Sequence, residues 1–257
     1  LENPQLMPSI QLGRAFSYHH FVFANYSRGN RVPTWTEMFY TDPSNVGNPN
    51  LQPEFSNAAE LGYRYNRNQY NPKGYFWKLD ASLFYRQHTN MIDWVRETSL
   101  VSPNPNPWMP VNIANVAFTG METSLQFNIN KSGTWGPNKF NLNYTYITAK
   151  HNFTSEQESR YAITSMRHQL NGQALFDLSE KVQLNLTYRL VQRIEQDLYQ
   201  VVDAKVLIAI NTHWTVFAEG NNLTNTQYVE AGFVQMPGRW FKLGLTFGHR
   251  AIDNPRP

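Results

Sequence analysis

The stretch Val182-Gln183-Leu184-Asn185-Leu186-Thr187-Tyr188-Arg189-Leu190 decides the fold class of this chain. Every even position in it is apolar and every odd position is polar. Because successive side chains of a β-strand point to opposite faces, the segment forms one apolar and one polar surface. The same alternation recurs in residues 77–85, 121–129, 140–146 and 241–247, and no comparably long stretch has a helical period.

This period predicts an all-β chain of about eleven antiparallel strands. Short connectors alternate with mostly longer ones, such as residues 31–55 and 97–111, as in outer-membrane barrels with turns at one rim and loops at the other. The expected strands lie near residues 6–16, 20–30, 56–66, 75–96, 112–130, 139–151, 165–178, 181–195, 199–211, 213–222 and 235–248.

The composition favours strands with one face in an apolar environment and the other in water. Aromatic residues make up 14% of the 257 residues and charged residues only 16%, whereas soluble domains devote about a quarter to charge. No run of about 18 apolar residues exists to form a transmembrane helix. There are no cysteines, which excludes disulfides and thiolate metal sites, and the net charge of +3 comes without a basic run typical of nucleic-acid binding.

Strand length separates a membrane barrel from a soluble β-sandwich or propeller. Soluble strands average about five or six residues, whereas a tilted membrane strand needs about 9–11, which most of these segments reach. Aromatic residues suited to an interfacial girdle lie near several strand ends. Those expected girdle residues are Tyr26, Trp77, Tyr146, Tyr188 and Trp240. The fold class is therefore predicted to be an antiparallel transmembrane β-barrel.

Five local patterns, in order along the chain, resemble the C-terminal barrel half of TonB-dependent outer-membrane receptors. Each pattern also has a folding role: prolines cannot donate to a strand ladder, and asparagines satisfy turn backbone. We therefore interpret these residues as defining barrel geometry and not as contacts for cargo. The patterns are residues 27–34 with 37–38, residues 47–54 with 60–63, residues 115–122, residues 222–225 with 228, and residues 237–239.

The resemblance implies a 22-stranded barrel with an N-terminal plug inside it, located in the cell outer membrane. Residues 1–247 would form the C-terminal portion of that barrel and residues 248–257 a tail. The plug, the N-terminal barrel half and a signal peptide are expected to be absent from this chain. The implied partners are outer-membrane lipid, a small nutrient, and TonB through the absent plug segment.

The resemblance further implies uptake of a scarce nutrient such as a ferric siderophore or cobalamin, with no cofactor or resident metal in this chain. Haem ranks lower because residues 32–51 contain no His, and His151 lies in another outer loop. Aromatic rings stack on cargo and arginine pairs with anions, so outer-loop residues of these types are candidate contacts. The candidates are Trp35, Phe39, Tyr40, Trp94, Trp108, Met109, Arg160 and Tyr161, which equally suit packing of one loop on another.

Other classes stay open at this stage. An autonomous barrel enzyme needs converging acid, base or nucleophile groups, and the sequence contains neither G-x-S-x-G nor a His pair at metal-binding spacing. We therefore do not expect an enzyme. A passive porin and a soluble glycan-binding sandwich are the remaining alternatives, and a plug domain upstream would distinguish the transporter from all of them.

Overall fold

A computed structural model describes residues 5–67, 75–97, 106–129, 137–150, 157–160, 166–193, 197–230 and 234–248. Eleven strands follow one another in a single antiparallel sheet in the order β1-β2-β5-β6-β7-β8-β10-β11-β12-β13-β14, and a twelfth, β9 (Gln157–Ser159), pairs with β6. The expectation of eleven wall strands is therefore confirmed. Their bounds are β1 Ser9–Ala15, β2 His20–Arg31, β5 Glu54–Arg67, β6 Tyr75–Glu97, β7 Met109–Ile129, β8 Lys139–Lys150, β10 Met166–Asp177, β11 Val182–Arg193, β12 Tyr199–Ala209, β13 Trp214–Asn221 and β14 Trp240–Phe247.

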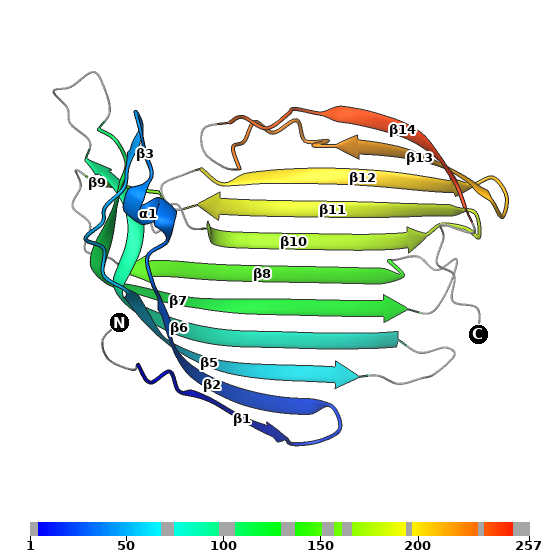
Figure 1. Ribbon diagram of the computed structural model, residues 1–257. Coiled ribbons are helices and arrows are strands. Elements are labelled where there is room, and N and C mark those ends of the chain that lie inside the picture. The colour runs from blue at the N-terminus through cyan, green and yellow to red at the C-terminus, as the bar shows by residue number, and fades with distance from the viewer. Residues whose placement is uncertain are drawn as a thin grey trace.

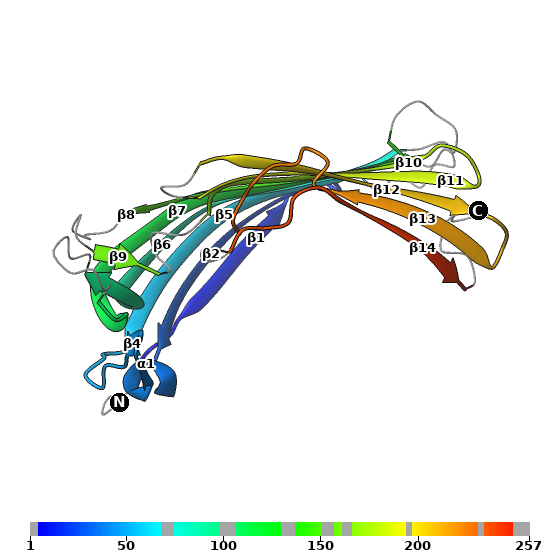
Figure 2. The ribbon, with the colours of Figure 1, turned by 90° about the horizontal axis from the view of Figure 1, so that it is seen from above.

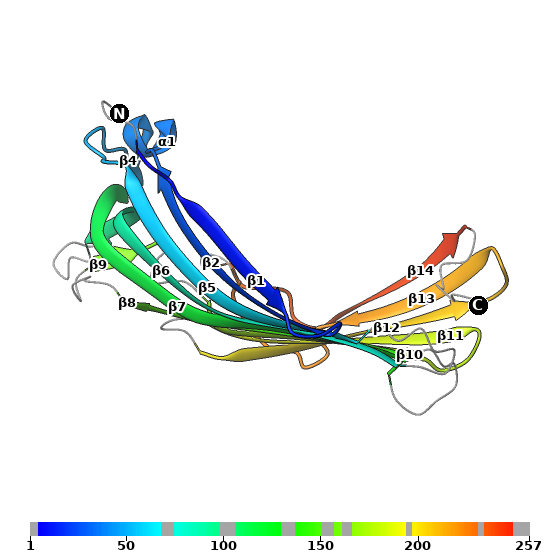
Figure 3. The ribbon, with the colours of Figure 1, turned by 90° about the horizontal axis from the view of Figure 1, so that it is seen from below.

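The sheet is an open, curved wall, with β1 and β14 at its two separate edges (Figures 1, 2 and 3). One end of the strands, here called the turn end, carries the connections at residues 16–19, 178–181 and 210–213. The other, the loop end, carries α1 (Trp35–Phe39), the hairpin β3 (Thr41–Asp42) and β4 (Asn45–Val46), and β9 (Figure 1). No helix among the described residues is long and apolar enough to cross a membrane.

Strand register assigns the side chains to two faces, because directly paired residues point to the same side. The lumen face contains Asn25, Glu60, Phe84 and Gly120, which follow one another across β2, β5, β6 and β7. Between the two ends of the wall, most of the charged side chains lie on this face. They are Glu60, Arg64, Lys78, Asp80, Arg86, Glu122, Lys139, Arg189, Asp203, Lys205, Glu219 and Lys242.

The opposite side, here called the lipid face, is apolar over its middle. Large side chains there are open to the surroundings, including Leu61 at 55% exposure, Leu83 at 60% and Leu243 at 80%. An exposed face of this kind is stable only in contact with another apolar phase, which for strands of this length is the hydrocarbon layer of a membrane.

Aromatic side chains border the lipid face at the turn end. The rings of Tyr65 and Trp77 lie 4.4 Å apart, and those of Trp214 and Phe247 lie 4.8 Å apart. This arrangement fits an interfacial girdle. Trp240 is an exception to our expectation, because its pairing with Asn221 places it on the lumen face with Glu219 and Lys242.

Two glycines on the lumen face permit aromatic rings to lie flat against the wall. A Cβ at Gly62 would collide with the ring of Phe23, and one at Gly120 with the ring of Phe84 and the Tyr146 carbonyl oxygen. The register around Gly120 runs without a shift, so this glycine marks a close approach and not a bulge.

The connection between β13 and β14 is fixed by one buried asparagine. Asn222 has a φ of 49° and is 3% exposed. Its side-chain amide donates to the carbonyl oxygens of Thr226 and Pro237, and its side-chain oxygen accepts from the Thr226 N–H. Asn225 in turn accepts a hydrogen bond from the Arg239 N–H. The expected role of these asparagines in satisfying turn backbone is confirmed.

Candidate functional site

A short helix lies at the loop end of the wall, directly after β2 (Figures 2 and 3). α1 begins after Thr34, whose hydroxyl accepts from the Glu37 N–H while the Glu37 carboxylate accepts from the Thr34 N–H, a capping box. Glu37 also accepts two hydrogen bonds of 2.9 Å from Arg31, which reaches Glu54 at 3.1 Å. Since Arg31 and Glu54 are paired on the lumen face, this ion network anchors α1 to the mouth of the lumen.

The network keeps its members charged. Burial alone would raise the pKa of Glu37, but hydrogen bonds from Thr34 and Arg31 outweigh it and hold that pKa below its ordinary value. Arg31 supplies the positive charge that faces both carboxylates. A helix docked by such a pair remains in place over the ordinary range of pH.

Three predicted contact residues lie together on this docked segment. The rings of Trp35 and Phe39 are 4.4 Å apart, and these residues are 77% and 48% exposed. Tyr40 is 48% exposed, and its hydroxyl donates to Asp42, which raises the pKa of the phenol. The structure therefore presents an aromatic platform, defined as Trp35, Phe39 and Tyr40, beside the lumen mouth.

A second group of predicted residues surrounds Trp108. The indole ring lies 4.7 Å from the guanidinium carbon of Arg96 and 4.8 Å from that of Arg160. Backbone hydrogen bonds join Trp108 to Ser44 and Val46, so β4 is tied to the residue that precedes β7. Trp108 and Arg160 are thus held in a packed cluster, while the adjacent Met109 is 41% exposed.

The other candidate cargo contacts are either buried or outside the described residues. Trp94 is only 8% exposed, because it lies in the extension of β6 that pairs with β9, and this burial leaves little of it for cargo. Beside it, Asp93 is fully buried and accepts a hydrogen bond from the Ser159 hydroxyl. Tyr161 and His151 lie outside the described residues.

A second cluster of polar and aromatic side chains, which no sequence motif indicated, joins β11 and β12 to the β13–β14 connection. Arg189, on the lumen face, donates to the carboxylate of Glu230 at 2.5 Å. The rings of Tyr199 and Tyr228 stack with centroids 4.7 Å apart. These contacts fold the β13–β14 connection toward the lumen side. The pairing of Arg189 with Glu230 spans 41 positions, so no local pattern could have revealed it.

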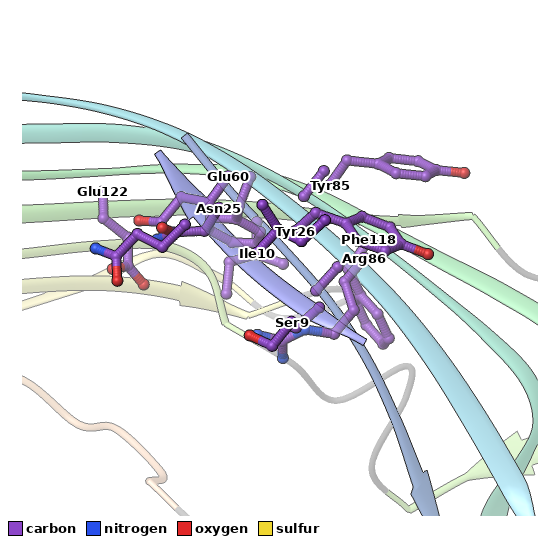
Figure 4. A pocket seen from close by; sticks show the side chains of 15 residues that line it. Ser9, Ile10, Asn25, Tyr26, Glu60, Tyr85, Arg86, Phe118 and Glu122 are labelled. Carbon is purple, nitrogen blue, oxygen red and sulfur yellow. The ribbon is translucent and has the colours of Figure 1, made fainter. Parts of the chain in front are cut away.

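A hollow on the wall is lined by residues from β1, β2, β5, β6, β7 and β8 (Figure 4). Asn25, Glu60 and Glu122 gather at one end of it, and Arg86 and Phe118 lie at the other. The Asn25 amide donates to Glu60 at 3.1 Å. Two carboxylates against one guanidinium give the hollow a net negative charge, which favours a cationic group from whatever occupies the lumen.

The described residues offer several groups that can contact a ligand. No group of three His, Cys, Asp or Glu side chains within those ranges could hold a metal ion. The exposed aromatic platform can stack on a flat ligand, and the lumen wall offers ion pairs and amides to a polar one.

Comparison with known proteins decides the family. A family model described as "TonB dependent receptor-like, beta-barrel" matches residues 5–223. The chain belongs to the TonB-dependent receptor family. Its wall is accordingly part of an outer-membrane barrel, and the family resemblance expected from the sequence motifs is confirmed.

The relatives that the chain matches are named as receptors and transporters. The chain is 33% identical over 119 residues to the vitamin B12 transporter BtuB of Vibrio vulnificus (strain YJ016), covering 46% of this chain and 17% of that protein. Among solved structures it is similar to the siderophore receptor PirA of Pseudomonas aeruginosa, with a TM-score of 0.64, 19% identity, and coverage of 94% of this chain and 39% of the receptor.

The hemophore receptor HasR of Serratia marcescens, solved with its hemophore HasA and heme, gives a TM-score of 0.68 at 20% identity, covering 95% of this chain and 39% of HasR. The chain therefore spans less than half the length of the relatives it matches. These solved structures, at such identities, support the fold of the wall.

Proposed function

We propose that this chain forms the C-terminal half of the barrel wall and part of the outer loops of a transporter. The complete protein would capture a scarce nutrient at the cell surface and import it with energy delivered by TonB through a plug domain. The family match across residues 5–223 carries this proposal. The division of the wall into an apolar lipid face and a charged lumen face supports it, because a transport barrel requires both.

Cargo would first contact the aromatic platform. Trp35, Phe39 and Tyr40 expose flat rings next to an ion network that fixes their position, so stacking on a ligand loses little conformational freedom. Met109, Arg160 and Trp108 would form a second contact, with Trp108 acting mainly as the support for both guanidinium groups. Tyr161 remains a proposed contact on sequence grounds alone.

Cobalamin or a ferric siderophore is the proposed cargo. The sequence relative named as a vitamin B12 transporter favours cobalamin as the first to test. Haem is less favoured, because residues 32–51, which include the platform, contain no His to bind iron. Cobalamin carries a large corrin ring and a catecholate siderophore carries aromatic rings, and both suit an aromatic platform.

The lumen hollow supports the presence of an inner domain. Glu60 and Glu122 face a space that Arg86 neutralises only in part, and a basic side chain of a plug would complete the pairing. The residues that lie outside this chain in the longer relatives leave ample length for such a domain.

Uptake by the full-length receptor tests the proposal. Cells that express it would be supplied with labelled cobalamin or a labelled ferric siderophore, with TonB present or deleted. We expect saturable, TonB-dependent uptake of one of the two. Replacing both Trp35 and Phe39 by alanine should raise the half-saturating concentration by roughly 5- to 140-fold, since each ring contributes about 0.5–1.5 kcal/mol.

Tyr18→Ala is the control, because Tyr18 is a fully exposed aromatic residue that lies at the turn end, away from the platform. It should leave uptake unchanged. Uptake that persists without TonB would contradict the transporter assignment and support a passive pore. Normal uptake by the double alanine variant would remove the platform from the cargo site.

A further inference from the structure

The segment that leads from β4 into β5, residues 47–54, contains one of the motifs that resemble the family. Residues 47–53 belong to no helix or strand. Leu51 in the middle of the segment is nevertheless only 6% exposed, whereas connecting segments usually run over the surface. A connection that is irregular and yet packed is held by specific contacts, and these contacts reach α1 and the strands β6 and β7.

The last residue of the segment joins α1 to β6 through one carboxylate oxygen. The Oε2 of Glu54 accepts from the Arg31 guanidinium at 3.1 Å and from the Ile92 N–H at 2.9 Å. The pairing of β5 with β6 ends at Thr89, so Glu54 supplies to Ile92 the acceptor that a neighbouring strand would otherwise supply. Because Arg31 also binds Glu37, the carboxylate of Glu54 links the anchor of α1 to the backbone of β6.

The start of the segment lies directly against the backbone of α1. The Gly47 N–H donates to the Tyr40 carbonyl oxygen at 2.8 Å, and the Asn48 N–H donates to the Glu37 carbonyl oxygen at 2.9 Å. A Cβ at position 47 would lie 2.8 Å from the carbonyl carbon and oxygen of Met38, closer than real Cβ contacts allow. Glycine is therefore required for this close approach of two backbones.

Side-chain amides fasten the middle of the segment to β7. The Asn48 amide donates to the Pro110 carbonyl oxygen at 3.1 Å. The side chain of Asn112 accepts from the Gln52 N–H at 2.7 Å and donates to the Gln52 carbonyl oxygen at 2.8 Å, so it serves both backbone groups of that residue. The 47–54 segment thus has α1 bonded to its two ends and the wall strands β6 and β7 bonded along its length.

We propose that the 47–54 segment positions the aromatic platform for cargo binding, with Gly47 and Glu54 as its positioning residues. The inference rests on the proposed role of the platform. A helix of five residues has little stability of its own, so its place depends on contacts with its neighbours. The segment supplies those contacts from two sides, and a platform that is fixed in advance loses little freedom when cargo binds. Neither positioning residue contacts cargo, because each acts through α1.

The position of α1 in the full-length receptor tests this inference without any cargo. Spin labels would be attached through Thr36→Cys on α1 and Lys150→Cys at the loop end of β8, both exposed positions, in a background without other cysteines. Double electron–electron resonance should give one narrow distance distribution. Glu54→Gln should broaden it by removing the charge that holds Arg31, and Gly47→Ala should broaden it by placing a methyl group against the α1 backbone.

Uptake kinetics connect the position of α1 with cargo binding. Glu54→Gln should raise the half-saturating concentration by about 5-fold with an unchanged maximal rate, since a charge-assisted hydrogen bond becomes a neutral one. Gly47→Ala should raise the same quantity. Asp80→Asn is the matched control, because Asp80 is also a lumen-face carboxylate, paired with Arg64 at 2.6 Å, but lies nearer the turn end. It should alter neither the distance distribution nor uptake.

A distance distribution that stays narrow in both variants would overturn the proposal, whatever the cargo is. An equal effect of Asp80→Asn would overturn it as well, and so would a broadened distribution with an unchanged half-saturating concentration. The double alanine variant of Trp35 and Phe39 separates these results from a failure of the proposed function. Normal uptake by that variant removes the platform from the cargo site, whereas impaired uptake by it and normal uptake by Glu54→Gln and Gly47→Ala remove only the positioning role of the 47–54 segment.

Discussion

Leu186→Arg is the substitution whose cost in folding free energy follows most directly from the two faces of the wall. Leu186 lies on the lipid face between Ala174 of β10 and Ala204 of β12, neither of which can shield a new charge. It is four residues from Val182, where β11 begins, and four from Leu190. At about 3.3 Å a residue and the usual tilt, it lies roughly 10 Å from either border, near the centre of the apolar band.

At that depth an arginine costs about 2–4 kcal/mol, which lowers the folding equilibrium constant by about 30- to 900-fold. The matched control is Thr187→Arg, one position further on. Thr187 points to the lumen and pairs with Asp203, so the new guanidinium meets water and a carboxylate and should cost little.

The assay is denaturant-dependent folding of the full-length receptor into lipid vesicles, followed by tryptophan fluorescence. The two variants are compared by their free energies of folding. Because both introduce arginine into the same strand, the difference between these values cancels any loss of strand propensity. Equal costs for the two arginines, or a greater cost for Thr187→Arg, would refute the assignment of faces.

Three further predictions concern individual contacts. Gly62→Ala should destabilise the receptor by about 1–3 kcal/mol in the same assay, because the new methyl group collides with the Phe23 ring; no loss would mean that the ring moves freely. Asn222→Ala should cost about 1–3 kcal/mol and increase proteolysis of the β13–β14 connection, since buried backbone groups lose their partners; unchanged cleavage would contradict this. The lowered pKa of Glu37 means that α1 docking is fully stabilised above the ordinary value of 4.5 and is lost as pH falls through the folded-state pKa. Tryptophan fluorescence that reports Trp35 should change in that acidic range, and Glu37→Gln should abolish the change.

The strands were predictable because their pattern is set by the two phases that they meet. Alternation in β11 follows directly from lipid on one side and water on the other, and the same cause operates along every wall strand. The expectation for Trp240 is wrong because aromatic residues near strand ends occur both in the girdle and at the rim of the lumen. Only the pairing with Asn221 distinguishes them.

The loop end was less predictable because its structure depends on contacts between distant residues. The sequence predicts a long connector over residues 31–55, whereas these residues contain α1 and the β3–β4 hairpin. A signal for α1 was present, since Thr34 and Glu37 have the spacing of a capping box. None existed for β9, three residues long, whose pairing with β6 spans about 60 positions.

The central claim is that alternate residues of each strand meet lipid and lumen, and site-directed spin labelling tests it most directly. This chain has no cysteines of its own, so single cysteines can be placed at each position from 182 to 190 of the full-length receptor in a bilayer, with any cysteine outside this chain replaced by serine. Collision rates with oxygen should peak at even positions, and those with a water-soluble nickel chelate at odd ones. A profile without a two-residue period, or with the opposite phase, would contradict the account.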